Sequence, residues 1–311
     1  LASMEIKGVP IDRENLENFN NNLKMSIDVL EKEIYELAGE EFNLNSPKQL
    51  GVILFEKLGM KPPKKTKTGY STNAETLEGL RKYHPVIDVI LNYRSYQKLN
   101  STYVEGFIDK IQPDGRIYST FNQTETRTGR ISSSEPNLQN IPVRTELGSE
   151  LRKFFVAKDG HILLDADYSQ IELRILAHIS GDKVMSEAFI NGDDIHARTA
   201  SQVMKLPMEM ITPQLRSRAK AVNFGIVYGI SEFSLSEDIG VTRWEARDYI
   251  ESYLANYRGV KNYMKQVVED ARECGYTCTM YGRRRYIPEL KSSNFNVRSG
   301  AERMTLNTPI Q

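Results

Sequence analysis

The sequence has 311 residues, of which 40% are hydrophobic and 26% are charged, so it can bury a sizeable core and divide into two or three lobes. Lys plus Arg and Asp plus Glu both number 41, which excludes a strongly basic or acidic chain and leaves only local basic patches to bind a polyanion. No apolar stretch approaches the length of a membrane span, and no basic segment followed by an apolar one opens the chain. We therefore expect a cytoplasmic protein with no membrane partner.

The first part of the chain has the pattern of long helices. Apolar residues recur at spacings of three and four over residues 13–38, which predicts one amphipathic helix ending near Gly39. A coiled-coil pairing face is the alternative interpretation of this spacing. A second helix is framed by Ser46 as its N-cap, Pro47 in its first turn and Gly59 after its last.

A lysine-rich loop and a third helix complete this helical region. Residues 61–69 contain prolines, threonines and four lysines, including Lys65 and Lys67. Such a loop is either simply solvated or able to bind a phosphate backbone. Another helical pattern then runs from about Val86 toward Tyr103.

Strands are expected from Ile111 onward. Residues 113–115 are Pro-Asp-Gly, a turn sequence, and the alternating run 117–121 after it predicts a strand. Residues 122–145 are polar and irregular, with arginines among neutral amides. A long polar loop in a compact domain is usually functional or disordered.

An aspartate follows a short apolar run in the middle of the chain. Residues 162–164 are Ile-Leu-Leu and predict a buried strand that ends just before Asp167. A helical pattern follows, with Ile171, Ile175 and Leu176 on one face. A carboxylate at the end of a strand suits a hard cation such as Mg2+. On residue types alone, a turn or capping aspartate is the more common interpretation of Asp167.

A second informative segment is a helix with cations and aromatic residues on one face. Thr212 and Pro213 predict its start. Four residues recur at every fourth position along it: Arg216, Lys220, Phe224 and Tyr228. Cations near the N-terminal half oppose the helix dipole, which suggests a bound polyanion, and the aromatic residues can stack on a base. The alternative is a surface helix whose cations pair with acids and whose aromatic residues are core.

Three other segments have weaker functional signals. Residues 281–286 form a basic cluster flanked by tyrosines, which either contacts a nucleic-acid backbone or is a solvated turn. Cys274 and Cys278 form a Cys-x3-Cys pair without partners, a weak zinc signal. Asp193 and Asp194 resemble a paired-carboxylate metal motif, but Asp194 directly precedes a helical run and is expected to be its N-cap.

Taken together, these segments closely resemble the family A DNA polymerases, essentially from end to end. The motifs, in family order, are Thr-Gly-Arg-Ile-Ser-Ser at 128–133, Pro-Asn-Leu-Gln-Asn-Ile-Pro at 136–142, Asp-Tyr-Ser-Gln-Ile-Glu-Leu-Arg at 167–174 and Arg-Ser-Arg-Ala-Lys-Ala-Val-Asn-Phe-Gly-Ile-Val-Tyr-Gly at 216–229. The resemblance implies an α+β right-hand polymerase fold, mostly helical with an incomplete antiparallel palm sheet. Its parts would be a helical thumb at 1–110, a palm segment with the aspartate strand at 111–190, helical fingers at 191–290 and the start of a C-terminal palm segment at 291–311.

The resemblance also implies an activity. A family A polymerase transfers deoxynucleoside triphosphates onto a primer 3'-hydroxyl under the direction of a template, in DNA replication and repair, by a two-metal mechanism. The implied partners are primer-template DNA and dNTPs, the implied cofactors are two Mg2+ ions, and the protein is expected to be a monomer associated with the nucleoid. Asp167 and the backbone carbonyl of Tyr168 would be the metal ligands.

The remaining functional residues are carried over position by position. Asp167, Arg216 and Lys220 are expected to be catalytic, and the residues expected to bind the dNTP are Arg216, Lys220, Phe224, Tyr228, His196, Gln170 and Glu172. Glu172 stands at the family position that excludes a ribose 2'-hydroxyl. Contacts with DNA are expected from Arg130, Asn137, Gln139, Asn140, Arg144, Arg303, Asn307 and Gln311, and from Lys65 and Lys67 of the basic loop.

The sequence departs from the family in one respect. The family's third motif, a hairpin with His-Asp-Glu, does not occur in the chain, so the second metal-binding aspartate is absent. We expect a fragment that is inactive alone and less stable than a version extended through that motif. A non-catalytic module that binds primer-template or nucleotide is therefore the alternative function. A single-subunit RNA polymerase is a third possibility, and Glu172 argues against it.

Overall fold

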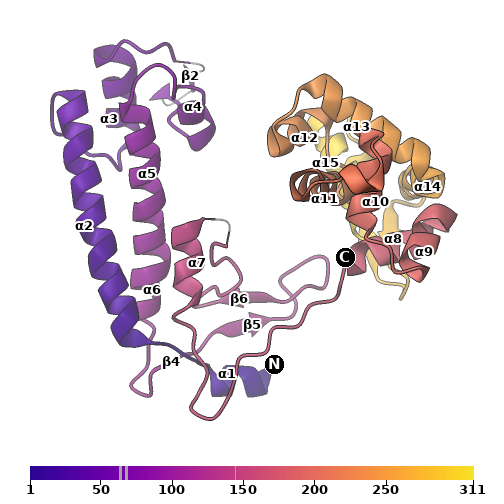
Figure 1. Cartoon of the computed structure of the whole chain (residues 1–311), viewed down its shortest axis with the longest axis horizontal. Helices are drawn as coiled ribbons and strands as arrows, with labels where there is room; N and C mark the ends of the chain where they lie inside the picture. The colour runs from indigo at the N-terminus through magenta and orange to yellow at the C-terminus, as the bar shows by residue number, and fades with distance from the viewer. Residues whose placement is uncertain (63–64, 67–68, 144) are drawn as a thin grey trace. The chain divides into compact units, whose positions relative to one another are not determined.

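The computed structural model describes residues 1–62, 65–66, 69–143 and 145–311, and within them the chain packs as two compact units. The first unit contains residues 1–125 and 131–164, and the second contains residues 126–130 and 165–311 (Figure 1). In the described part of the chain, no helix combines the length and the apolar character needed to cross a membrane.

The first unit is mainly helical. Its helices are α1 (Ala2–Lys7), α2 (Arg13–Ala38), α3 (Pro47–Val52), α4 (Ala74–Glu78), α5 (Val86–Lys98), α6 (Glu105–Ile108) and α7 (Glu146–Arg152), with π-helical turns Ile53–Lys57 and Leu99–Val104 continuing α3 and α5. Among its described residues, three antiparallel two-stranded sheets pair β1 (Val9–Pro10) with β4 (Arg116–Ile117), β2 (Lys65–Thr66) with β3 (Gly69–Tyr70), and β5 (Thr120–Asn122) with β6 (Ser132–Ser134).

The long amphipathic helix predicted over residues 13–38 is confirmed as α2. Asp12 caps its N-terminus by accepting a hydrogen bond from the backbone N–H of Asn15. Gly39 ends it with φ 77°, a left-handed conformation that glycine adopts without a Cβ clash. The apolar face packs along α5, where Ile27 and Ile34 share a core with Ile90 (Figure 1). This face is therefore part of the unit's own core.

The strand predicted over residues 117–121 is wrong as a single element. Its first residue belongs to β4, and its last two belong to β5, which pairs with a different partner. Between them, the buried hydroxyl of Ser119 lies 2.7 Å from the hydroxyl of Ser133 and donates to the carbonyl oxygen of Pro136 at 2.8 Å. The alternating pattern predicted extended backbone but could not indicate that its two ends pair with separate strands.

The buried strand predicted at residues 162–164 is also wrong. Residues 161–168 form no strand and are exposed, with Ile162 87%, Leu163 64% and Leu164 87% accessible. A strand requires backbone hydrogen bonds to a neighbour, and no described strand pairs with this segment. The helix predicted after Asp167 is present as α8 (Ile171–Ser180), but it buries Leu173, Leu176 and Ala177 and leaves Ile171 43% exposed.

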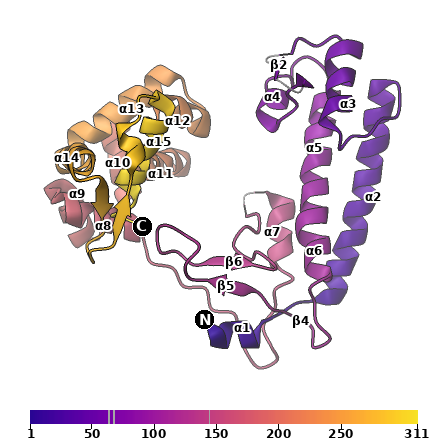
Figure 2. The same ribbon diagram turned by 180° about the vertical axis from the view of Figure 1, so that it is seen from behind.

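The second unit is a helical assembly with one small hairpin. It contains α8 with α9 (Lys183–Ile190), α10 (Ile195–Met204), α11 (Pro213–Val227), α12 (Glu232–Ile239), α13 (Arg243–Asn256), α14 (Arg258–Cys274) and α15 (Phe295–Asn307), the 3-10 turns Met208–Met210 and Pro288–Lys291, and the antiparallel strands β7 (Tyr276–Cys278) and β8 (Arg284–Tyr286). Figure 2 shows α10 and α11 side by side among the other helices. The chain is mostly helical with small antiparallel sheets, so the predicted α+β class is confirmed.

A buried carboxylate joins two helix starts in the second unit. Asp182 is 3% exposed and caps α9 by accepting from the N–H of Met185 at 2.9 Å. Its other oxygen accepts from the N–H of Gly259, in the first turn of α14, at 2.8 Å. A Cβ on Gly259 would lie 2.7 Å from the Asp182 Cα, so only glycine permits this approach. Asp182 therefore fixes the start of α14 against that of α9.

Candidate active site

A cleft of about 540 Å³ in the second unit gathers most of the residues for which the sequence predicts a role. It is lined by Arg130, the segment from Asp167 to Glu172, His196 of α10, Arg216, Lys220 and Phe224 of α11, and Tyr228, which caps the C-terminus of α11. The spacing of four along α11 places its predicted residues on one face, while the opposite face, with Ala219 and Val222, is buried.

The cationic face of α11 is only partly paired with acids. Thr212 caps the helix through the N–H of Leu215, and Pro213 is its first residue, as predicted. Arg216 donates from Nε to Asp194 at 2.6 Å. Lys220 is exposed, and among the described residues its ammonium group has no carboxylate partner, lying 6.0 Å from the centre of the Phe224 ring. Among the described residues, the cleft therefore has a cation without a carboxylate partner at the middle of α11.

Asp194 is the N-cap of α10, as the sequence predicts. One oxygen accepts from the N–H groups of His196 and Ala197 at 3.0 and 3.2 Å, and the other accepts from Arg216. Burial raises the pKa of Asp194, but the hydrogen bonds from Arg216 and the two amides outweigh burial, and its pKa is lowered. Asp194 therefore orients Arg216, whose two terminal nitrogens have no described partner.

His196 is buried at 2% exposure beside these cations. Burial lowers its pKa first, and the positive charges of Arg216 and Lys220 lower it further, against a smaller opposing effect of Asp194. Its Nδ1 accepts a hydrogen bond from the Asn223 side-chain amide at 3.1 Å. His196 is therefore neutral at pH 7. The sequence interpretation missed Asn223, although an asparagine inside a helix is a disfavoured residue that calls for a partner.

Glu172 is held by two neighbours at the other side of the cleft. It accepts a hydrogen bond from the Tyr228 hydroxyl and one from Arg130 at 2.6 Å, and its side chain is 15% exposed. Burial raises the pKa of Tyr228, and the bond to Glu172 raises it further, while a hydrogen bond with the Gln311 side chain lowers it. Glu172 therefore occupies a defined position.

Asp167 and Tyr168 are the exposed part of the site. Asp167 has no hydrogen-bond or ion-pair partner among the described residues, and Tyr168 is 79% accessible. In the described part of the chain, no three His, Cys, Asp or Glu residues cluster as a metal site. Cys274 and Cys278 are free and exposed. Asp167 thus offers the cleft one unpaired carboxylate beside neighbouring backbone oxygens.

The residues predicted to contact DNA are distributed over both units. In the first unit, Asn137, Gln139 and Asn140 are exposed on the segment after β6, and Gln139 donates to the carbonyl of Ile131 at 2.8 Å. In the second unit, Arg303 and Asn307 belong to α15, and Gln311 follows that helix. Lys65 begins β2, while Lys67 and Arg144 lie outside the described residues. Of this set, Arg130 lines the cleft and Gln311 reaches Tyr228.

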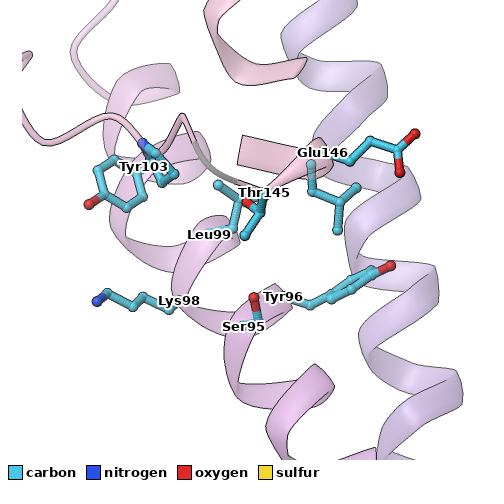
Figure 3. A pocket seen from close by; sticks show the side chains of 9 residues that line it. Ser95, Tyr96, Lys98, Leu99, Tyr103, Thr145 and Glu146 are labelled. Atoms are coloured by element: carbon cyan, nitrogen blue, oxygen red, sulfur yellow. The ribbon is translucent and has the colours of Figure 1, made fainter. Parts of the chain in front are cut away.

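A second cleft, of about 350 Å³, lies in the first unit (Figure 3). Lys98 and Tyr96 of α5, Tyr103 of its π-helical continuation, and Thr145 and Glu146 at the start of α7 surround it. None of the described residues with a predicted role lines this cleft.

Comparison with known proteins agrees with the predicted family. The sequence matches the model of DNA polymerase family A over residues 13–311. DNA polymerase I of Bacillus caldotenax is 51% identical over 314 residues, and that of Bacillus subtilis (strain 168) is 52% identical over 313 residues. Each alignment covers 100% of this chain but only 36% of the relative.

A solved structure shares the fold as well as the sequence. The POL domain of Pol1 from M. smegmatis, determined in complex with DNA primer-template and dNTP, is 44% identical to the chain, with a TM-score of 0.89. The match covers 99% of this chain and 55% of that one. The predicted polymerase fold is therefore confirmed, and the chain belongs to the family A DNA polymerases.

Proposed function

We propose that this chain binds primer-template DNA and a dNTP and takes part in template-directed addition of the nucleotide to the primer 3'-hydroxyl. The observation that carries the proposal is the cleft of the second unit, where two cations and a neutral histidine on helices share one space with Asp167. Cationic groups and an unpaired carboxylate in one cleft suit a nucleoside triphosphate with its Mg2+. The complex of the M. smegmatis relative with DNA and dNTP supports the same partners.

The oxygen donors of the cleft fit magnesium. Mg2+ prefers oxygen ligands and is usually bound by one or two carboxylates together with water and substrate phosphates. Asp167 and the Tyr168 carbonyl would hold the two ions expected of the family, with the triphosphate completing the shell. When bound there, Mg2+ would lower the pKa of the attacking hydroxyl and neutralise charge on the phosphates.

The residues of α11 would act on the triphosphate. In the reaction, the primer 3'-oxygen forms a bond to the α-phosphorus, the bond to the bridging oxygen breaks, and pyrophosphate leaves. Arg216, oriented by Asp194, would bind the phosphate tail with its terminal nitrogens. Lys220 would bind the same tail and place a proton or positive charge at the leaving pyrophosphate. Phe224 would lie against the incoming sugar and base.

Glu172 and Tyr228 would select the sugar. Their hydrogen bond, together with that from Arg130, holds the Glu172 carboxylate at the edge of the cleft. A carboxylate in that position occupies the space that a ribose 2'-hydroxyl needs, so it favours deoxynucleotides. We further propose that the DNA duplex contacts Arg130 and the α15 residues Arg303 and Asn307, and that the protein acts in replication and repair as a monomer.

A primer-extension assay tests the proposal. The 311-residue chain is compared with a chimera in which it replaces the matching segment of Bacillus subtilis DNA polymerase I. We expect Mg2+-dependent incorporation of dNTPs by the chimera, and its loss when Asp167 is changed to Asn. Incorporation that does not depend on Asp167 would contradict the assignment of this cleft.

A binding-only function is the second candidate. It is favoured because Asp167 has no second or third metal-binding side chain clustered with it among the described residues. Under this alternative, the 311-residue chain binds primer-template and dNTP but extends no primer. Fluorescence anisotropy of a labelled primer-template measures the binding and primer extension measures turnover. Asp167-dependent incorporation by the 311-residue chain would exclude the binding-only function.

A further inference from the structure

A chain of buried hydrogen bonds links α10, α11 and the junction of α13 and α14. It connects Tyr257, Thr199, Asn223 and His196, of which none is more than 2% exposed. The Thr199 hydroxyl lies 3.4 Å from the Tyr257 hydroxyl and donates to the Asn223 Oδ1 at 3.2 Å. The Asn223 Nδ2 lies 3.1 Å from the His196 Nδ1.

A backbone carbonyl determines which way the Asn223 amide points. The Asn223 Nδ2 donates to the carbonyl oxygen of Ala219, one turn earlier in α11, at 3.0 Å. A carbonyl only accepts, so the nitrogen of the amide must lie on this side and its oxygen on the side of Thr199. The second N–H of the amide is then directed at His196.

The position of the histidine proton follows from this orientation. An amide nitrogen only donates, so the His196 Nδ1 must be the acceptor and cannot have a proton. A neutral imidazole has one proton, which is therefore on Nε2. A doubly protonated ring would place two donors against each other in a buried position, which costs free energy.

The Nε2 edge is the part of His196 left for a ligand. The Nδ1 edge contacts Asn223, and the residue lines the cleft together with Arg216 and Lys220. A neutral ring that offers one N–H beside two cations adds a donor for an anion without adding charge repulsion. The charged groups around it are Arg216, Lys220 and Asp194.

We propose that Asn223 is a positioning residue that holds His196 as a neutral Nε2–H donor toward the phosphates of the bound nucleotide. The inference rests on the proposed function for its ligand. Asn223 itself contacts no substrate. It keeps the donor in place when a bound polyphosphate would otherwise favour the doubly protonated ring, so the contact of His196 with the nucleotide stays independent of pH near neutrality.

The tautomer can be observed directly in the 311-residue chain. The sequence contains four histidines, so 15N imidazole NMR of histidine-labelled protein is tractable, and a His196→Gln sample assigns the signal. We expect His196 to show a protonated Nε2 and an acceptor Nδ1, unchanged between about pH 8 and pH 7. A proton on Nδ1, or titration of His196 across this range, would overturn the proposal.

Addition of Mg2+ with inorganic tripolyphosphate, and separately with dATP, tests the ligand. We expect the His196 Nε2 resonance to shift on binding while Nδ1 remains an acceptor. An unshifted Nε2 with the predicted tautomer would overturn the phosphate contact alone. Absence of any dATP binding would contradict the proposed function and leave the tautomer result standing, so the two failures are distinguishable.

Asn223→Asp tests the positioning role, with Thr199→Val as the matched control. A carboxylate in place of the amide accepts from Nδ1, so the ring gains a proton there. We expect the affinity of the variant for dATP, relative to wild type at each pH, to rise about tenfold from pH 8 to pH 6. Thr199→Val leaves the amide oriented by Ala219, so its relative affinity should not change with pH. A flat ratio for a folded Asn223→Asp protein would refute the role, and the wild-type tautomer decides the question if that variant does not fold.

Discussion

Two regions of the candidate site differ in how firmly the chain holds them. The helices α10 and α11 keep His196 and Arg216 in place through buried side chains, an N-cap and the ion pair with Asp194. Asp167 belongs to residues 161–168, which are exposed and form no strand. One region is held by its own packing, and the other by few contacts.

The difference separates the two tasks proposed for the site. A preorganised cationic face binds an anion without ordering side chains first. A carboxylate on an exposed, unpaired segment loses conformational entropy when it coordinates a cation. Binding of the nucleotide tail should therefore depend on the integrity of the helical core, whereas changes around Asp167 should affect chemistry and leave stability unchanged.

The largest expected effect is that of Asp167→Asn in the chimera. Loss of the carboxylate should reduce kcat/KM for dNTP incorporation at least about a thousandfold, or about 4 kcal/mol. Because Asp167 is exposed and unpaired, the free energy of unfolding should change by less than about 0.5 kcal/mol. Single-turnover primer extension and urea unfolding measure the two quantities. Asp165→Asn, on the same exposed segment but outside the cleft, is the control, and an equal loss of activity there would remove the special role of Asp167.

Truncation of one leucine in the core of the second unit and of one in residues 161–168 compares the packing of these two parts. Leu173 is fully buried in α8 and belongs to the core of the second unit, so Leu173→Ala should lower the free energy of unfolding by about 3 kcal/mol. Leu163 is 64% exposed, and Leu163→Ala should change it by less than about 0.5 kcal/mol. Urea unfolding followed by circular dichroism measures both. Similar losses would mean that residues 161–168 are packed in solution.

Glu172 tests whether a side chain fixed by the helical region selects the sugar. In the chimera, Glu172→Ala removes the acceptor for Tyr228 and Arg130 and opens the proposed 2'-hydroxyl space. The preference for dNTP over rNTP should fall by about tenfold to a hundredfold, or roughly 1.4 to 2.7 kcal/mol. Competition between dATP and ATP in primer extension measures it. The control is Glu187→Ala on α9, which is exposed and outside the cleft and should not alter the preference. An unchanged preference in Glu172→Ala would contradict the assignment of Glu172.

The smallest expected effect is a pH dependence of stability from His196. Its folded-state pKa lies below the ordinary 6.5, chiefly because of burial. Between these two values the unfolded chain binds the extra proton, so stability should decrease as the pH falls below about 6.5. Urea unfolding at a series of pH values should show this slope in the wild type and a weaker one in His196→Gln. The exposed His178→Gln should retain the wild-type slope; an identical slope in all three proteins would count against a buried, neutral His196.

Local chemistry made much of the second unit predictable. Thr212 and Pro213 mark the start of α11, Asp194 caps α10, and the spacing of four brings Arg216 and Lys220 to one face. Such signals act within a few residues of the chain, so they require no knowledge of distant partners. The roles of these residues in binding and catalysis remain predictions.

Non-local contacts were the source of the errors and omissions. An apolar run such as 162–164 predicts a buried strand only if another strand lies beside it, and the described chain supplies none. The division between β4 and β5 likewise depends on which strands pair. Asn223 was missed because its hydrogen-bond partner is a histidine 27 residues away in sequence.

The family, the mainly helical α+β class, the helix ends and the cationic face could be recognised from the sequence, because motifs, caps and periodicity are encoded by neighbouring residues. Only the folded structure showed that Asp194 pairs with Arg216, that Glu172 binds Tyr228, and that the Asn223 amide contacts His196. These pairs join different helices or segments. Their hydrogen bonds depend on how the elements pack, and no local pattern determines that packing.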